Sequence, residues 1–343
     1  MIVPQVKNSF RLVSMILIVI VTSLVNSGSA IASSSDGEEF NPGDMIMHDI
    51  QDNHIWHFID GHYGTLYLPI IVYSKEKGLE MFSSSNFYDD EHKIVDYNGY
   101  KLDHNHISIA NSEAHVYDIS ITKNVAMLFI NATIMILIFM AVAKGYKKNV
   151  GKAPTGIQSF FEPIIIYLRD EVIKPNIGSK YERYLPYLLS LFFFIWFGNL
   201  LGLMPGAANL TGNIAVTAVL AISTFLIVNF SGNKQYWGHI FKTPGVPLAL
   251  LPIIVPVEII GIFTKPISLL IRLFVAISAG HIVILSLLGL TFIFQSYAVG
   301  VGSTLIVIFI NLIELLVATI QAYVFTMFSA LYIGMAVADH DDH

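Results

Sequence analysis

The chain has 343 residues, of which 54% are hydrophobic and 13% charged, and its formal net charge at pH 7 is -6. Soluble proteins carry about a quarter charged residues, so this composition disfavours a soluble enzyme, a nucleic-acid-binding protein or a disordered scaffold and indicates a membrane protein. The sequence has no cysteine, which excludes disulfides, thiolate nucleophiles and cysteine zinc sites. Residues 33–118 hold 16 acidic residues against 4 lysines, whereas residues 119–343 hold 13 basic against 9 acidic residues, which implies two environments.

Residues 1–32 have the pattern of a secretory signal peptide. Basic residues precede an apolar run over 12–25, and Ala30 and Ala32 supply the small residues that suit signal peptidase. The run has 14 residues, short of the ~20 that a helix needs to cross a bilayer. We predict export and cleavage, with a retained membrane anchor as the alternative.

Residues 33–118 are predicted to form a small exported, periplasmic segment of α and β structure. Helical periodicity is weak, and the run 65–73 is typical of β-strands. Eight of the twelve histidines fall here, so a metal site is the alternative to plain surface histidines. We favour surface histidines and predict no metal or other cofactor, because no ligand motif such as His-Glu-x-x-His occurs.

The hydropathy of residues 119–338 predicts an all-α polytopic membrane protein. About five transmembrane helices are expected, over Val125–Ala143, Tyr184–Leu203, Gly212–Phe230, Val246–Leu290 and Phe292–Ala338. The last two are longer than a perpendicular helix requires, so each should be strongly tilted or broken. The segment Ala153–Lys174 mixes apolar and charged positions, which favours a helix along the membrane interface.

The basic residues predict the orientation. Lys144, Lys147 and Lys148 follow the first span, so this end should face the cytoplasm of a bacterial inner membrane. Five crossings from an exported N-terminus then leave the tail, residues 339–343, in the cytoplasm.

Three ionisable residues stand out in the apolar region. Arg272, His281 and Glu314 are the only Asp, Glu, Lys, Arg or His residues among the 72 positions from 267 to 338. Burying a charge in a bilayer costs at least ~2.5 kcal/mol, so such residues usually line water, a partner or an ion path. Snorkelling of Arg272 toward the interface is the alternative.

Helical spacing divides the polar groups into two tracks. On an unbroken helix Glu258 and Arg272 lie within about 40° of one face, whereas Arg272 and His281 point in opposite directions. Glu314 and Gln321 are seven residues apart and share a face. Two offset pieces separated by a permanent cation suit a rotary ion motor, but a proton-coupled secondary transporter could hold the same groups.

Several motifs of this region closely resemble subunit a of F-type ATP synthases. They are KPISLLIRLF at 265–274, Ala-Gly-His at 279–281, GNLLGLMP at 198–205, and Glu314 followed by QAYVF at 321–325. The resemblance covers about residues 119–338 and the order of the spans. The long exported segment, with HIWHF at 54–58, looks like the extended N-terminus of subunit a in some Bacteroidetes-like bacteria.

The resemblance implies a role for each matching residue. Arg272 falls on the family's essential arginine, which faces the rotating ring of c subunits and favours the deprotonated ring carboxylate. Gln321 falls on a glutamine that is a hydrogen-bonding neighbour of this arginine, and Glu258 on a position of the cytoplasmic half-channel. Further polar residues are secondary channel-lining candidates: Asn199, Ser268, Ser278 and Asn311.

The chain departs from the family pattern at two places. Many bacterial members have Glu at the position of His281 and His at the position of Glu314, so the acid and the imidazole are exchanged. A proton relay needs both groups near each other, and we therefore predict that the two side chains lie within about 10 Å. The second departure is Ala276, where many relatives have Asn.

The implied function is proton translocation between the periplasm and the c-ring through two half-channels, coupled to ring rotation and ATP synthesis. The implied partners are the c-ring, the b subunits and the rest of the F1F0 ATP synthase, together with membrane lipid and the transported proton; nucleic acid is not expected. No phosphate-binding loop occurs, so ATP chemistry is assigned to other subunits and this subunit is non-catalytic. The alternatives are the secondary transporter and, more weakly, a membrane metalloenzyme.

Overall fold

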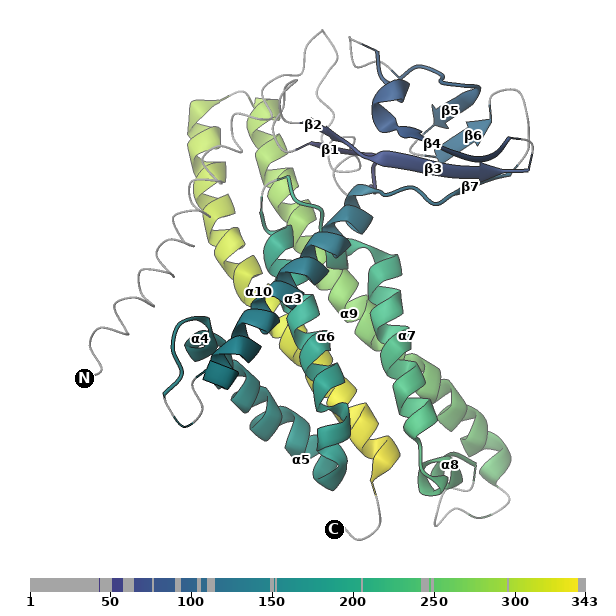
Figure 1. The fold of residues 1–343 in the computed structure, drawn as a ribbon, viewed down its shortest axis with the longest axis vertical. Coiled ribbons are helices and arrows are strands. Elements are labelled where there is room, and N and C mark those ends of the chain that lie inside the picture. Colours follow the sequence, from purple (N-terminus) through teal and green to yellow (C-terminus); the bar gives the residue numbers. More distant parts are fainter. Residues whose placement is uncertain are drawn as a thin grey trace. The chain divides into compact units, whose positions relative to one another are not determined.

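A computed structural model describes residues 43, 51–57, 65–75, 77–89, 94–103, 106–109, 115–148, 151, 153–204, 206–241, 247, 250–294 and 296–338 (Figure 1). The predicted signal peptide at 1–32 and the tail at 339–343 lie outside these residues. The chain divides into two compact units. Unit 1 comprises Met1–Phe129, Leu201–Ala208 and Ile282–Asn311, and unit 2 comprises Ile130–Leu200, Asn209–His281 and Leu312–His343.

The N-terminal part of unit 1 is built from short antiparallel strands. These are β1 (Ile55–His57), β2 (Thr65–Tyr67), β3 (Pro69–Ser74), β4 (Gly78–Ser83), β5 (Tyr100–Asp103), β6 (His106–Ile109) and β7 (Val116–Asp118), with a 3-10 turn at Ser84–Phe87. They form a β1-β2 pair, a three-stranded sheet in the order β4-β3-β7 and a β5-β6 pair. The strands predicted over 65–73 are confirmed.

Two apolar clusters hold unit 1 together. Ile70 and Val72 on β3 are fully buried against Tyr100 and Leu102 on β5, because alternate residues of a strand face one side. A second cluster comprises Trp56, Leu68, Met127 and Ala208. The Trp56 indole also donates a 2.6 Å hydrogen bond to the Gly206 carbonyl. The strands are therefore packed onto the beginning of the helical region.

The rest of the described chain is helical. The elements are α3 (Lys123–Lys148), α4 (Ile157–Tyr167), a π-helical turn (Leu168–Ile173), α5 (Lys174–Ile177), a 3-10 turn (Gly178–Lys180), α6 (Tyr181–Gly202), a 3-10 turn (Leu210–Gly212), α7 (Ile214–Ser231), α8 (Lys234–Phe241), α9 (Leu251–Phe294) and α10 (Tyr297–Val337). Among the described residues, five helical stretches are long and apolar enough to cross a membrane. The prediction of a polytopic membrane protein is confirmed.

The boundaries differ from the predicted ones in places. Helix α9 ends at Phe294 and α10 begins at Tyr297, whereas the predicted boundary was at residue 291, and each helix is continuous within its bounds. The segment Ala153–Lys174 is helical from Ile157 and continues through the π-helical turn and two short helices into α6. Leu168 and Ile173 are almost fully buried in the core of unit 2, so part of this segment packs against protein. Helix α8 was not predicted.

Helix α6 supplies the centre of the unit 2 core. Leu188, Phe193 and Ile195 are fully buried in a cluster that also contains Leu269 of α9 and Ala322 of α10. Small residues recur on α10, where Ala318, Ala322, Ala330 and Ala336 are fully buried. Small side chains let helix backbones approach closely, which is how helices associate in lipid.

Candidate functional site

Helices α9 and α10 bring the predicted site residues together in unit 2. Three side-chain contacts fix their pairing: His281 with Glu314, Arg272 with Phe328, and Lys265 with Tyr332. Residue numbers fall along α9 as they rise along α10, so the two helices pack antiparallel. We call this line of contacts between α9 and α10, from His281–Glu314 through Arg272–Phe328 to Lys265–Tyr332, the seam.

The acid and imidazole form the first contact on this seam. His281 Nδ1 lies 3.2 Å from Glu314 Oε1, which confirms the predicted proximity. Glu314 is only 3% exposed, and its Oε2 is buried with no hydrogen-bond partner in the described part of the chain. A buried acid in contact with an imidazole can pass a proton over one hydrogen bond.

Gly280 makes room for this pair. A Cβ at Gly280 would lie 2.8 Å from Glu314 Oε1 and 3.0 Å from its carboxyl carbon. Real Cβ atoms essentially never approach other atoms this closely. A side chain at position 280 would therefore displace the Glu314 carboxylate from its present place.

Arg272 occupies a second place on the seam. Its guanidinium carbon lies 4.3 Å from the centre of the Phe328 ring, within the range of a cation–π interaction. Its Nη1 is buried without a hydrogen-bond partner, and within the described residues no carboxylate lies in ion-pair distance. Among the residues that the structure describes, the cation of Arg272 between these two apolar helices therefore has no compensating carboxylate.

Gln321 lies between these two places on α10. It is one heptad after Glu314 and one heptad before Phe328, so the three share a face of the helix. In the described part of the chain no hydrogen bond joins Gln321 to Arg272, in contrast to what the family resemblance implied. The guanidinium rests on Phe328 instead.

The predicted opposite orientation of Arg272 and His281 is wrong for their functional atoms. Both side chains contact α10, through Phe328 and Glu314 respectively. The angle between two residues on an ideal helix describes the directions of their Cβ atoms only. The guanidinium at the end of a long arginine side chain can lie well away from that direction. The two groups are separated along the seam, not around α9.

Glu258 lies toward the other end of α9. It is half-buried and interacts electrostatically with Tyr236 of α8 and with Lys265. A small, mainly apolar crevice lies beside them, and its lining includes the polar side chains of Asn229, Tyr236 and Lys265. The buried Tyr236 hydroxyl, which has no hydrogen-bond partner among the described residues, was not singled out from the sequence. A tyrosine in a predicted loop carries no signal of burial.

The sequence is similar to known proteins over most of its length. A family model described as "ATP synthase A chain" matches residues 125–334, and a model of a domain of unknown function matches residues 45–128. The chain belongs to the ATP synthase subunit a family. A relative from Chlorobaculum tepidum, "ATP synthase subunit a 2", is 41% identical over 92% of this chain and 78% of its own length. "ATP synthase subunit a" of Chloroherpeton thalassium is 46% identical over 74% of this chain and 78% of its own length.

As a member of the subunit a family, the chain is a proton-translocating F0 subunit of ATP synthase, and the catalytic sites of the complex lie in other subunits. The family match covers α9 and α10, which carry the seam, and includes most of the five long apolar stretches. The strands fall in the other matched region, 45–128. Strand-rich structure is therefore joined to a subunit a membrane region.

Among the secondary candidates, Asn199 has both ends of its amide engaged. Its Nδ2 donates to the Ala318 carbonyl over 3.1 Å, and its Oδ1 accepts a 2.6 Å hydrogen bond from the Thr211 hydroxyl. One helical turn earlier, the Trp196 indole donates to the Thr319 hydroxyl over 3.0 Å. These bonds tie α6 to α10, so Asn199 has a structural function in this state.

The other three secondary candidates differ in their surroundings. Ser278 has a buried hydroxyl with no hydrogen-bond partner in the described part of the chain, whereas Ser268 is exposed. Asn311 donates to the Val307 carbonyl of its own helix over 3.0 Å. Of these three candidates, only Ser278 has a buried side-chain oxygen without a hydrogen-bond partner among the described residues.

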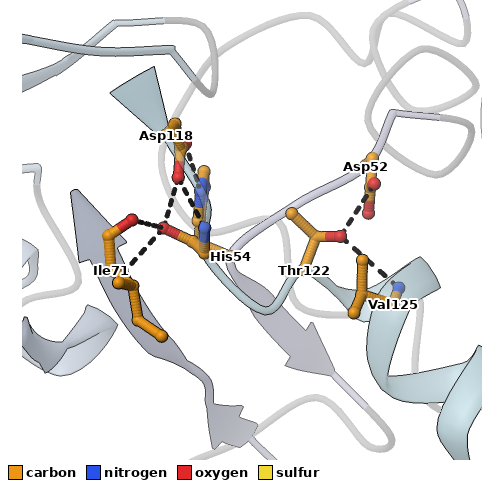
Figure 2. A network of polar contacts seen from close by, with 7 residues as sticks. Asp52, His54, Ile71, Asp118, Thr122 and Val125 are labelled. Atoms are coloured by element: carbon orange, nitrogen blue, oxygen red, sulfur yellow. Dashed lines mark hydrogen bonds and ion pairs between the residues drawn. The ribbon is translucent and has the colours of Figure 1, made fainter. Parts of the chain in front are cut away.

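A separate polar network lies where the strands meet α3 (Figure 2). His54 Nε2 lies 3.0 Å from Asp118 Oδ2, and His54 is 3% exposed. Burial raises the pKa of Asp118, but hydrogen bonds from His54 and Ser120 outweigh burial and leave this pKa below its ordinary value. Asp52 accepts hydrogen bonds from the Thr122 hydroxyl and from the backbone N–H of Asn124, so its carboxylate caps the N-terminus of α3. Within the described residues, no group of three His, Asp or Glu could hold a metal ion.

Proposed function

We propose that this subunit forms two proton half-channels at the surface of a c-ring and couples proton flow to ring rotation and ATP synthesis. The observation that carries the proposal is the uncompensated guanidinium of Arg272 on the seam between α9 and α10. An arginine guanidinium is always charged in proteins, so Arg272 carries a permanent positive charge. A permanent charge in the membrane is costly unless another group compensates it.

The missing negative charge is assigned to a partner. A carboxylate on a passing c subunit would be held in its deprotonated form opposite Arg272, because a nearby cation favours the charged form of an acid. The acid must lose its proton to one side before it meets Arg272 and regain a proton from the other side afterwards. A fixed cation also blocks direct passage of protons between the two sides.

The remaining site residues form the two routes. His281 and Glu314, joined at 3.2 Å, relay protons on the periplasmic side, and Glu258 serves the cytoplasmic half-channel beside the crevice. This assignment follows from an N-terminal segment in the periplasm and a C-terminus in the cytoplasm. The b subunits and the other F1F0 subunits complete the assembly.

The first test is ATP-driven acidification of inverted membrane vesicles that contain wild-type protein or Arg272→Ala. Lys234→Ala is the matched control, since Lys234 is an exposed cation on α8. We expect pumping to vanish in Arg272→Ala and to persist in the control, with the whole complex assembled in both. Full pumping by an assembled Arg272→Ala complex would refute the proposed role of this residue.

A second test exchanges the relay pair. His281→Glu and Glu314→His are made singly and together, and pumping is measured in the same vesicles. Each single variant places two like groups on the seam and should lose most of its pumping, while the double variant restores one acid and one imidazole at the same contact and should recover part of it. A double variant no better than the single ones would count against a relay.

A further inference from the structure

The three-stranded sheet β4-β3-β7 has an apolar outer face. Its inner face carries Ile70 and Val72 into the core, so the residues between them point the other way. The register places Tyr73 opposite both Leu79 and Tyr117, and Ile71 opposite Met81. The outer face is thus formed by Ile71, Tyr73, Leu79, Met81, Tyr117 and Ile119.

All of these side chains except the partly buried Ile71 are exposed. Leu79 is 68% exposed and Met81 69%, and Ile119 is 64% exposed. Within the three described strands, no Asp, Glu, Lys or Arg side chain points to this face. An antiparallel sheet with one face in water normally alternates apolar and polar residues, and a contiguous apolar patch marks an interaction surface.

A short connection, held by backbone hydrogen bonds, joins the sheet to the first transmembrane helix, α3. Ile119 donates its backbone N–H to the Ile71 carbonyl over 2.9 Å, and Ile121 donates to the Pro69 carbonyl over 3.2 Å. Lys123, the first residue of α3, then donates to the Asn53 carbonyl over 3.0 Å. Four extended residues span at most about 14 Å. Ile119 therefore lies within about 14 Å of the start of a membrane helix.

We propose that the outer face of this sheet rests on the lipid bilayer at the surface where α3 enters it. Exposed apolar residues recur along the chain from Ile119 into the first turns of α3, at Val125 and Phe129, so the patch is followed directly by a helix whose exposed apolar side chains meet lipid. Tyrosines such as Tyr73 and Tyr117 are favoured at the boundary between headgroups and acyl chains. Leucine and methionine side chains beside them can enter the acyl region without burying a charge.

This proposal is independent of the proton path, because it requires only that α3 spans the membrane. It assigns to the strand-rich region a function as a membrane-surface anchor of subunit a. A protein partner on the same face is the competing occupant. Continuity with α3 favours lipid, since a partner would have to cover the patch and stop at the helix.

The absence of cysteine allows a direct test in the complete chain. Leu79→Cys and Met81→Cys are labelled singly with an environment-sensitive fluorophore in ATP synthase reconstituted into phosphatidylcholine vesicles. Ser108→Cys is the matched control, because Ser108 is exposed on β6, whose alternate residues Ile107 and Ile109 pack into the core. Quenching is measured with aqueous iodide and with a lipid-borne nitroxide, and values are normalised to position 108 to correct for vesicle orientation.

We expect positions 79 and 81 to show at least about fivefold less iodide quenching than position 108 and strong quenching by the lipid-borne nitroxide. Iodide quenching equal to that at position 108 would overturn the proposal. Protection from both quenchers would also overturn it, because it would place a protein partner on the face. Loss of proton pumping by Arg272→Ala bears on the proposed function alone and does not alter these outcomes.

Discussion

The substitution Gly280→Ala separates the effect of a residue on folding stability from its effect on proton pumping. In Gly280→Ala the new Cβ would lie 2.8 Å from Glu314 Oε1, whereas ordinary contacts begin near 3.4 Å. The nearest atoms belong to the end of a flexible side chain, so the carboxylate can retreat by about 0.6 Å or more without moving the helices. This retreat stretches or breaks its 3.2 Å contact with His281.

The two effects of this substitution have opposite signs. Alanine in place of glycine inside a helix favours folding by about 1 kcal/mol. A hydrogen bond to a charged group contributes about 1.5–3 kcal/mol, and each 1.36 kcal/mol on a barrier is a factor of ten in rate. We expect Gly280→Ala to assemble at least as well as wild type but to pump protons about tenfold more slowly or worse.

The assay is ATP-driven acidification of inverted vesicles, with the amount of assembled complex measured on the same membranes. Gly261→Ala is the matched control on α9, because nothing in the described chain lies within 4 Å of a Cβ at that position. If Gly280→Ala pumps at the rate of Gly261→Ala, close packing between the glycine and Glu314 is irrelevant to proton transfer and the reasoning fails.

Three further substitutions test other parts of the fold. Asp118→Asn should remove an acid-sensitive contribution to stability. Hydrogen bonds with His54 and a serine lower the pKa of Asp118 in the folded chain. The contribution is therefore complete above the unfolded pKa of about 3.9 and disappears as the pH falls through the folded pKa. Thermal melting between pH 3 and 7 should show wild type losing its advantage over the variant at low pH; an unchanged difference would contradict this. Asn199→Leu breaks two buried hydrogen bonds and should destabilise the chain by about 1–3 kcal/mol, seen as a lower melting temperature. Gly334→Ala would force a Cβ into a backbone carbonyl of α5 and should reduce assembled complex on native gels, whereas Gly302→Ala, with open space around it, should not.

Hydropathy predicted the membrane helices because apolar length is a local property. The span expected over Tyr184–Leu203 is α6 at Tyr181–Gly202, and the last two helices are continuous over 44 and 41 residues. The proximity of His281 and Glu314 was predicted from chemistry, since exchanged acid and imidazole positions are useful only if the side chains meet.

Tertiary contacts account for what the sequence did not predict. An arginine in an apolar helix predicts a functional cation, but its contact with Phe328 depends on how α9 and α10 are paired. Asn199 is a polar residue in an apolar span, as a channel-lining residue would be, yet its partners are the hydroxyl of Thr211, beyond the end of α6, and a carbonyl of α10, which is 119 residues away. In both cases the local pattern indicates the residue type and the packing determines its partner.

The length of α9 determines its tilt in the membrane and therefore the relative depths of the site residues. Its apolar stretch of 41 residues is about 62 Å long, so keeping it within a hydrocarbon core of about 30 Å requires a tilt of about 60°. Arg272 and His281, nine residues apart, are separated by about 13.5 Å along the helix, and at this tilt by about 7 Å in depth but about 12 Å in the membrane plane. Packed helices are 8–10 Å apart. Most of the separation between Arg272 and His281 therefore lies in the membrane plane, and it is only slightly larger than one helix spacing, which is the kind of displacement that rotation of a ring would supply.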